Sequence, residues 1–144
     1  MDNTKLEILD LMPHRDPFLF VDAIVDATSE KIITKYIFTG DECFFPGHFP
    51  EYKVVPGVIL IETMAQAGGA GLGRLGIVKK GSIFFLCTID KVKFRRPVLP
   101  GEEIRCEIVN LRASSRMIKQ QGKVYVGEEL AAEAEWMCLV KEGE

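Results

Sequence analysis

Residues 44–66, FFPGHFPEYKVVPGVILIETMAQ, decide how this chain folds. After Pro56 a proline-free segment, Val58 to Leu75, has a composition that favours a helix. The segment is apolar nearly all round, so we expect the helix to be buried. The same stretch nevertheless holds His48 and Glu62, two titratable groups among glycine, proline and bulky aliphatic residues. Either a satisfied core network holds them, or they perform acid–base chemistry in an apolar pocket.

The second half of the expected helix, AGGAGLGRLG at 67–76, is rich in small residues. Glycine inside a helix costs roughly 1 kcal/mol per position relative to alanine. Another element must therefore pack very close to this face, and we expect that element to be strand backbone.

Strand patterns surround the helix. A short amphipathic helix in TKLEILDLM ends at Pro13, and two segments rich in Val, Ile and Phe, 18–27 and 31–38, predict a hairpin. Beyond Gly81 the expected strands are 83–94, 102–112, 117–126 and 130–141. This order predicts one α+β domain over 1–144, an antiparallel sheet packed on one long buried helix. A second subunit would complete the enclosure of that helix.

Composition narrows the function classes. The chain has 144 residues, a net charge of −3 and a hydrophobic fraction of 47%, which argues against nucleic-acid binding and favours oligomerisation. Glu62 interrupts the longest apolar run and the N-terminus is polar, so we expect neither a membrane span nor a signal peptide. The four cysteines are widely spaced and there are two histidines. We therefore expect free thiols in a reducing cytoplasm and no zinc site.

Four strings in the sequence resemble one family. They are LMPHRDPFLFVD (11–22), FFPGHFP (44–50), PGVILIETMAQ (56–66) and TIDKVKFRRPVLPGE (88–102). Together they resemble the FabZ-type 3-hydroxyacyl-[acyl carrier protein] dehydratases of bacterial fatty-acid synthesis, over nearly the whole chain. The specific signal is GHFP followed at this spacing by PGV-x-x-x-E-x-x-A-Q. The sister family that also isomerises the double bond typically has aspartate at the position of Glu62.

The resemblance implies a hot-dog fold and a cytoplasmic lyase. The enzyme would convert a (3R)-3-hydroxyacyl thioester on acyl carrier protein to the trans-2-enoyl thioester, with loss of water and without a metal or organic cofactor. The resemblance also implies an active site at a homodimer interface, with His48 from one subunit and Glu62 from the helix of the other. The dimers would assemble as a trimer of dimers.

The elimination needs a base at C2, an acid at the C3 hydroxyl and a donor to the thioester oxygen. A neutral imidazole is a good base near neutral pH, so His48 fits the first role. Apolar neighbours disfavour a carboxylate anion, so Glu62 fits the second as a neutral acid. Gln66 shares a helix face with Glu62 and could hold its carboxyl. Gly57, in the first helical turn, could offer its N–H to the thioester oxygen.

Each of these assignments has a structural alternative. A histidine beside Phe and Pro often donates to a backbone carbonyl, and a glutamate on a buried helix can be a satisfied core carboxyl. Gln66 can be a structural hydrogen-bonding residue, and Gly57 a plain helix-start glycine. The motif combination favours catalysis for His48 and Glu62.

Other residues near the motifs receive structural interpretations. His14 in PHRDPF is interpreted as part of a turn network, because the mechanism already has its base. Phe84 and Phe85 could line or gate an acyl tunnel, but core packing is the preferred interpretation. The stretch EYKVV at 51–55 departs from the typical family pattern and leaves the substrate preference open.

One expected strand carries a run of cations. Lys91, Lys93 and Arg95 alternate along it, and Arg96 follows. The run is either a solvated edge that discourages aggregation or a dock for an acidic acyl carrier protein, weakened by salt.

Two other functions remain to be weighed against the dehydratase. A hot-dog thioesterase would release free thiol and would leave GHFP without a clear role. A non-catalytic acyl-binding subunit would bind acyl groups without turnover, and would have no reason to keep both His48 and Glu62. Isomerase activity as a second function stays open.

Overall fold

The computed structural model describes residues 3–142. The helices are α1 (Asn3–Leu11) and α2 (Gly57–Arg74), with a short 3-10 turn at Phe45–Gly47. The strands are β1 (Ala23–Ala27), β2 (Lys31–Ile37), β3 (Ile83–Phe94), β4 (Glu103–Ala113), β5 (Met117–Val126) and β6 (Glu129–Lys141).

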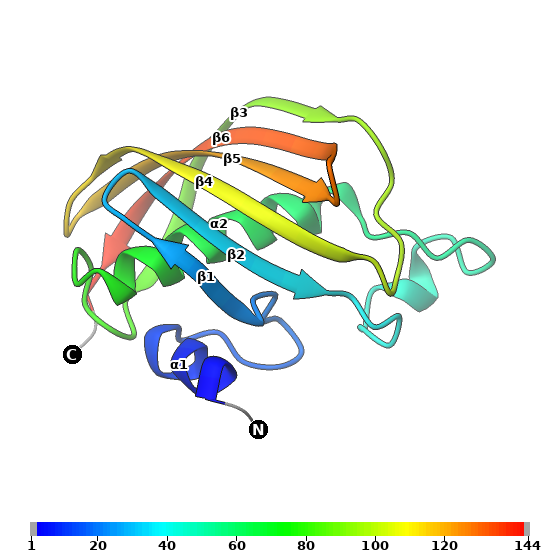
Figure 1. Ribbon diagram of the computed structural model, residues 1–144, viewed down its shortest axis with the longest axis horizontal. Helices are drawn as coiled ribbons and strands as arrows, with labels where there is room; N and C mark the ends of the chain where they lie inside the picture. Colours follow the sequence, from blue (N-terminus) through cyan, green and yellow to red (C-terminus); the bar gives the residue numbers. More distant parts are fainter. Residues whose placement is uncertain (1–2, 143–144) are drawn as a thin grey trace.

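One antiparallel sheet contains all six of these strands, in the order β1-β2-β4-β5-β6-β3. Figure 1 shows the sheet curving over α2, with α1 lying beside β1. The segment between β2 and α2 extends beyond the sheet at the end where α2 begins, whereas the β4–β5 hairpin lies at the opposite end. This is the hot-dog architecture, and it confirms the α+β prediction.

The glycines of α2 let the helix lie directly against the sheet. A methyl group on Gly68 would overlap the side-chain amide of Gln120 on β5, and one on Gly71 would lie 2.5 Å from Ile32 on β2. Alanine cannot occupy such positions unless its neighbours move. The small-residue face therefore lets the helix pack closely, as the sequence predicted, but its neighbours are side chains rather than the strand backbone that we expected.

The main core lies between α2 and the sheet. Its largest fully buried side chains include Trp136, Phe20, Phe38 and Phe45, and burying a large apolar side chain contributes about 1.5–3 kcal/mol. A second cluster, which includes Ile8 and Met12, anchors α1 against β1.

The structure corrects two of the predicted elements. β1 begins at Ala23 rather than Phe18, because the backbone of Phe18 and Phe20 bonds the Gln66 side chain on α2 instead of a neighbouring strand. The helix expected from Val58 to Leu75 begins at Gly57 and ends at Arg74. Its first turn is not buried as expected, since Val58 is 71% exposed.

β3 is an edge strand with an apolar surface. It is paired on one side by β6 alone, and its exposed large apolar residues are Ile83, Phe85, Leu86, Ile89, Val92 and Phe94. A long, exposed apolar edge can pair with another chain. Within residues 3–142, no helix has both the length and the apolar character needed to cross a membrane.

Candidate functional site

His48 lies in a groove at the start of α2. The groove has a volume of about 570 Å³ and is also lined by Gly57, Val58 and Phe94. The 3-10 turn at Phe45–Gly47 ends at His48. The Nδ1 atom of His48 lies 3.1 Å from the carbonyl oxygen of Val54. Because a carbonyl can only accept, Nδ1 carries the hydrogen, and Nε2 of the neutral ring is left as the proton acceptor.

Gly57 opens α2 in the same groove. Pro56 precedes the helix, and the first N–H groups of a helix have no partner within it. A methyl group on Gly57 would come within 2.9 Å of the Phe94 ring. The glycine thus keeps a helix N-terminus accessible beside the imidazole, at the positive end of the helix dipole.

Glu62 lies in a different pocket, on the side of α2 that faces the start of β3. That pocket has a volume of about 20 Å³ and is lined by His14, Glu62, Gln66, Phe84, Leu86 and Cys138, together with Ala65. One chain therefore places the two predicted catalytic residues in separate pockets.

Gln66 fixes the Glu62 carboxyl. Its Nε2 donates to Glu62 Oε2 at 2.8 Å and to the Phe18 carbonyl at 3.1 Å. Its Oε1 accepts from the Phe20 N–H at 2.8 Å. Oε2 of Glu62 is thus held as an acceptor, so Oε1 is the oxygen free to carry an acidic proton.

His14 also faces Glu62, which sequence reasoning missed. Its Nε2 lies 3.7 Å from Glu62 Oε2, whereas its Nδ1 is the one buried side-chain polar atom in residues 3–142 without a hydrogen-bond partner. Burial lowers the pKa of His14; Glu62 opposes this effect and Arg15 adds to it. The interpretation of His14 as part of a turn network therefore leaves out its position at the candidate site.

Phe84 and Phe85 have different environments. Phe84 lines the Glu62 pocket and packs against the core. Phe85 is 54% exposed on the edge strand, so the core interpretation is wrong for Phe85 in the single chain.

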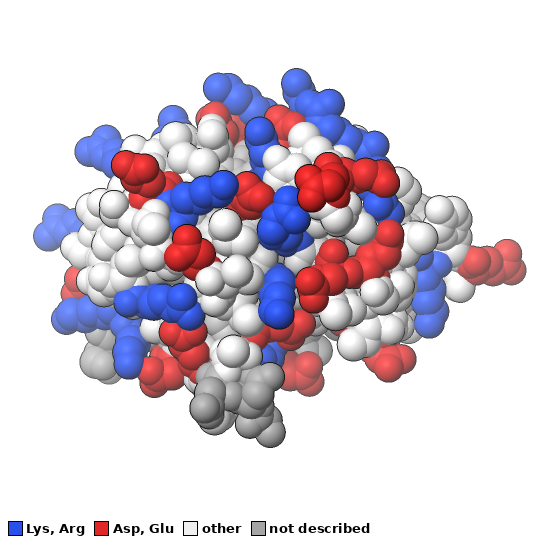
Figure 2. Space-filling view, viewed as in Figure 1, with Lys and Arg blue, Asp and Glu red and all other residues white. Residues whose placement is uncertain are grey.

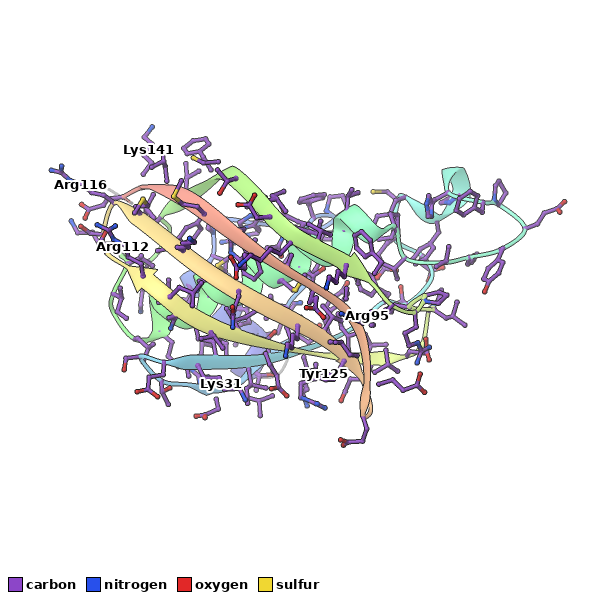
Figure 3. All side chains as sticks on the ribbon, turned by 90° about the horizontal axis from the view of Figure 1, so that it is seen from above. Lys31, Arg95, Arg112, Arg116, Tyr125 and Lys141 are labelled. Carbon is purple, nitrogen blue, oxygen red and sulfur yellow. The ribbon has the colours of Figure 1, made fainter. Side chains whose placement is uncertain are left out.

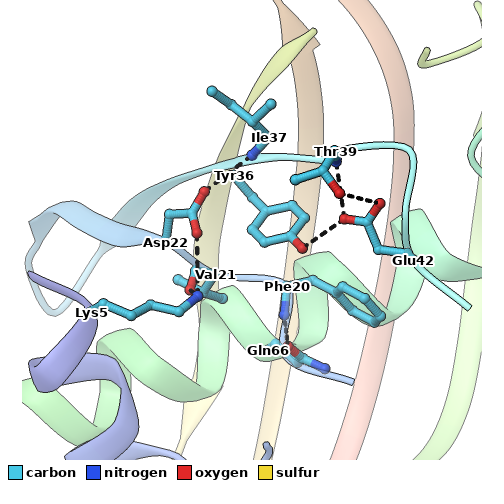
Figure 4. Close-up of polar contacts among 9 residues, drawn as sticks. All are labelled: Lys5, Phe20, Val21, Asp22, Tyr36, Ile37, Thr39, Glu42 and Gln66. Carbon is cyan, nitrogen blue, oxygen red and sulfur yellow. Dashed lines mark hydrogen bonds and ion pairs between the residues drawn. The ribbon is translucent and has the colours of Figure 1, made fainter. Parts of the chain in front are cut away.

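A polar network supports the segment that leads to His48 (Figure 4). The Glu42 carboxylate accepts from the hydroxyl of Tyr36 and from the backbone N–H groups of Thr39 and Gly40. Although burial alone would raise the pKa of Glu42, these hydrogen bonds lower it overall. No motif in the sequence pointed to this network.

Most of the predicted basic strand face is neutralised. Lys91 pairs with Glu135 at 3.4 Å and Arg95 with Glu133 at 2.9 Å, both across to β6. Arg96 pairs with Glu102 at 2.7 Å. Figure 2 likewise shows cations and anions interleaved over the face it presents. Of the four, Lys93 alone forms no ion pair within residues 3–142.

The cysteines are all free thiols, with Cys43 and Cys87 exposed and Cys106 and Cys138 buried. Across the described part of the chain, no three His, Cys, Asp or Glu residues lie together as a possible metal site.

Comparisons with known proteins show the family of the chain. The model of the FabA-like domain family matches residues 12–135. A 3-hydroxyacyl-[acyl-carrier-protein] dehydratase FabZ from Desulforamulus reducens is 44% identical over 134 residues, which cover 92% of this chain and 94% of the relative. The protein of the same name from Pelotomaculum thermopropionicum is 41% identical over 136 residues, covering 94% and 96%.

Two solved structures share the fold at low sequence identity. The dehydratase heterocomplex ApeI:P from Xenorhabdus doucetiae superposes with a TM-score of 0.80 at 16% identity, covering 95% of this chain and 91% of that chain. The uncharacterised protein PH1136 from Pyrococcus horikoshii gives a TM-score of 0.65 at 18% identity, covering 90% and 89%.

Proposed function

This chain belongs to the FabA-like family and is 41–44% identical to two FabZ dehydratases, and we propose that it dehydrates 3-hydroxyacyl groups carried on acyl carrier protein. The product is the trans-2-enoyl thioester, and the reaction belongs to fatty-acid synthesis. The observation that carries the proposal is that the chain offers a candidate base and a candidate acid, His48 lining one pocket and Glu62 lining another.

His48 removes the C2 proton through Nε2, the nitrogen that its bond to the Val54 carbonyl leaves unprotonated. The negative charge that develops on the thioester oxygen is stabilised by the N–H of Gly57 at the start of α2, in the same groove. The base that removes the proton and the N–H that stabilises the enolate thus lie in the same groove.

Glu62 donates the proton of Oε1 to the C3 hydroxyl, which leaves as water, while Gln66 holds Oε2. After the step, His48 carries one extra proton and Glu62 lacks one. Transfer of the proton from His48 to Glu62 through water completes the cycle.

The two pockets form one active site in a homodimer that pairs through β3. If two copies align their β3 strands antiparallel about a two-fold axis, the start of one β3 lies beside the end of the other. Phe84 and Leu86, from the Glu62 pocket, then approach the partner's Phe94, from the His48 groove. The exposed apolar edge of β3 supports this interface. A trimer of such dimers and a cytoplasmic location are parts of the same proposal, the latter supported by the free thiols.

The test is hydration of a short trans-2-enoyl thioester, the reverse reaction, followed by loss of the enoyl absorbance. Wild type should turn over, whereas His48→Ala and Glu62→Gln should each lose about 10²-fold or more. Mixing the two variants after reversible dissociation should restore activity, because a mixed dimer contains one site with both residues intact. If wild type is inert and releases free thiol instead, the chain is a thioesterase; tight acyl binding without either product indicates an acyl-binding subunit.

A further inference from the structure

Phe49, the residue that follows His48, has an unusual backbone conformation. Its φ angle is +56°, in the left-handed region that residues other than glycine rarely adopt. Within residues 3–142, Lys91 is the only other residue with a side chain and a positive φ, whereas five glycines share this conformation. Pro50 follows, and a residue before proline is pushed toward extended backbone. The backbone of Phe49 is therefore strained.

The strained residue begins a turn that brings the chain back to His48. The Tyr52 N–H donates to the Phe49 carbonyl at 2.8 Å, so the chain reverses direction between these two residues. Shortly afterwards, the Val54 carbonyl accepts from Nδ1 of His48 at 3.1 Å. Figure 3 shows this segment projecting beyond the sheet, at the end of the molecule away from Arg112.

The side chain of Phe49 lies against the imidazole of the candidate base. The two ring centroids are 4.3 Å apart, with an angle of 45° between the ring planes, so the rings are in van der Waals contact. Phe49 lines the same groove as His48, yet it is 60% exposed. Because a mostly exposed side chain buries little apolar area in the chain, the stability of the fold does not account for this ring.

His48 is thus held from three directions. Its backbone N–H donates to the Phe44 carbonyl at 3.1 Å, its Nδ1 donates to the Val54 carbonyl, and Phe49 lies against its ring. Nε2 is left as the proton acceptor. An imidazole whose orientation is fixed in this way needs no rearrangement before it removes a proton.

We propose that Phe49 is a positioning residue for His48, and that its left-handed backbone serves to place the aromatic ring on the imidazole. The inference rests on the proposed function. Strained backbone persists at functional sites where the surrounding structure enforces it. Glycine at this position would remove the strain, but it would also remove the ring that keeps Nε2 directed at the C2 proton.

The experiment separates the backbone of Phe49 from its ring. Phe49→Gly removes both the strain and the ring, Phe49→Leu keeps the strain without an aromatic ring, and Phe49→Tyr keeps both. Tyr52→Ala is the matched control, because Tyr52 is an aromatic residue of the same segment that is 58% exposed and does not line the groove. Each variant is assayed on a crotonyl and on a trans-2-decenoyl thioester.

Phe49→Gly and Phe49→Leu should each lose about ten- to a hundredfold in kcat with little change in KM, by the same factor on both substrates. Phe49→Tyr and Tyr52→Ala should match wild type. The urea midpoint of Phe49→Gly should equal or exceed that of wild type, because the strain is gone.

Three results would overturn the proposal. A loss that appears in KM and grows with the length of the acyl chain would make Phe49 a substrate contact. Full activity of Phe49→Leu would show that the aromatic ring is not needed. A lower urea midpoint or dissociation of the oligomer in Phe49→Gly, measured by sedimentation, would leave Phe49 with a packing or subunit-contact role.

A readout without turnover separates this proposal from the proposed function. The chain has two histidines, so the ring signals of isotope-labelled histidine in an NMR spectrum can be assigned by comparison with His48→Ala. In Phe49→Gly, the His48 ring protons should lose the ring-current shift from Phe49, whereas the His14 signals should stay in place. If wild type is inert and this change is found, the ring contact stands and the dehydratase function fails. If the His48 signals do not move, the positioning role is wrong.

Discussion

The imidazole of His14 and the carboxylate of Glu62 face each other across 3.7 Å, although the two residues lie far apart in the sequence. Gln66 holds the same carboxylate oxygen from the other direction, at 2.8 Å. Oε2 thus accepts a hydrogen bond from Gln66 and has the His14 imidazole beside it, beyond hydrogen-bond distance. In the proposed mechanism this arrangement leaves Oε1 to carry the acidic proton, and we predict that His14 is a positioning residue for the acid.

Replacement of His14 should affect turnover more than binding. In His14→Leu, the Glu62 carboxyl loses the imidazole that lies 3.7 Å from Oε2, and kcat should fall about ten- to a hundredfold with little change in KM. His14→Gln retains an N–H donor of similar reach and should recover much of the loss. Steady-state kinetics on the enoyl thioester check this; equal activities of the Leu and Gln variants would leave His14 with a packing role only.

The pH dependence of stability should report the lowered pKa of His14. Because burial lowers this pKa in the folded protein, the unfolded chain binds the proton more readily as the pH falls. The contribution of His14 to stability is therefore full above its ordinary pKa and is lost below it. From about pH 8 to about pH 5, wild type should lose more stability than His14→Gln in urea unfolding. Parallel curves for the two proteins would contradict this expectation.

Removal of the Gln66 amide should damage both stability and catalysis. In Gln66→Ala, the Phe20 N–H and the Phe18 carbonyl lose their partner, and each unsatisfied buried group costs about 1–3 kcal/mol. Glu62 also loses its closest donor. The free energy of unfolding, measured in urea, and kcat should therefore both fall. A variant of unchanged stability would mean that water replaces the amide.

Two glycines of α2 should respond in opposite ways to alanine. Gly68→Ala should destabilise the protein by about 1–3 kcal/mol, because the methyl group overlaps the Gln120 amide. In Gly73→Ala the methyl group meets Leu11 at 3.4 Å, an ordinary contact, so better helix propensity should stabilise the protein by up to about 1 kcal/mol. Thermal unfolding of both variants measures the difference.

Thiol labelling should reveal the β3 interface. Burial raises the pKa of both Cys106 and Cys138 to about 12, so neither should react in the folded protein. Cys43 is exposed and should react quickly. Cys87 is exposed in the single chain but lies on β3, so the proposed dimer should protect it. Two fast-reacting thiols per chain would argue against pairing through β3.

The sequence predicted the parts of the fold that depend on local pattern. The glycine-rich half of α2 predicted that another element packs closely against the helix. The strand patterns beyond Gly81 predicted β3 to β6 to within one residue at either end. The start of β1 was misplaced, because the apolar residues from Phe18 onward are bound by Gln66 rather than by a strand.

The contacts of the candidate site needed the structure. His48 and Glu62 were identified from their motif, but their placement in separate pockets depends on the chain path. The neighbours of His14 could not be predicted, because tertiary packing alone brings it to Glu62. The acids that neutralise Lys91 and Arg95 come from β6, and cross-strand register is not visible in sequence spacing.

The glycine face of α2 also bears on how sequence change in this protein would be interpreted. Gly68 and Gly71 lie in the same helix, α2, as Glu62 and Gln66, within a few turns of them. A bulkier residue at either glycine would lift or rotate the whole helix and move the acid out of alignment. In a saturation mutagenesis screen for activity, substitutions at these glycines would therefore abolish activity as substitutions in the active site do, although the glycines face the sheet.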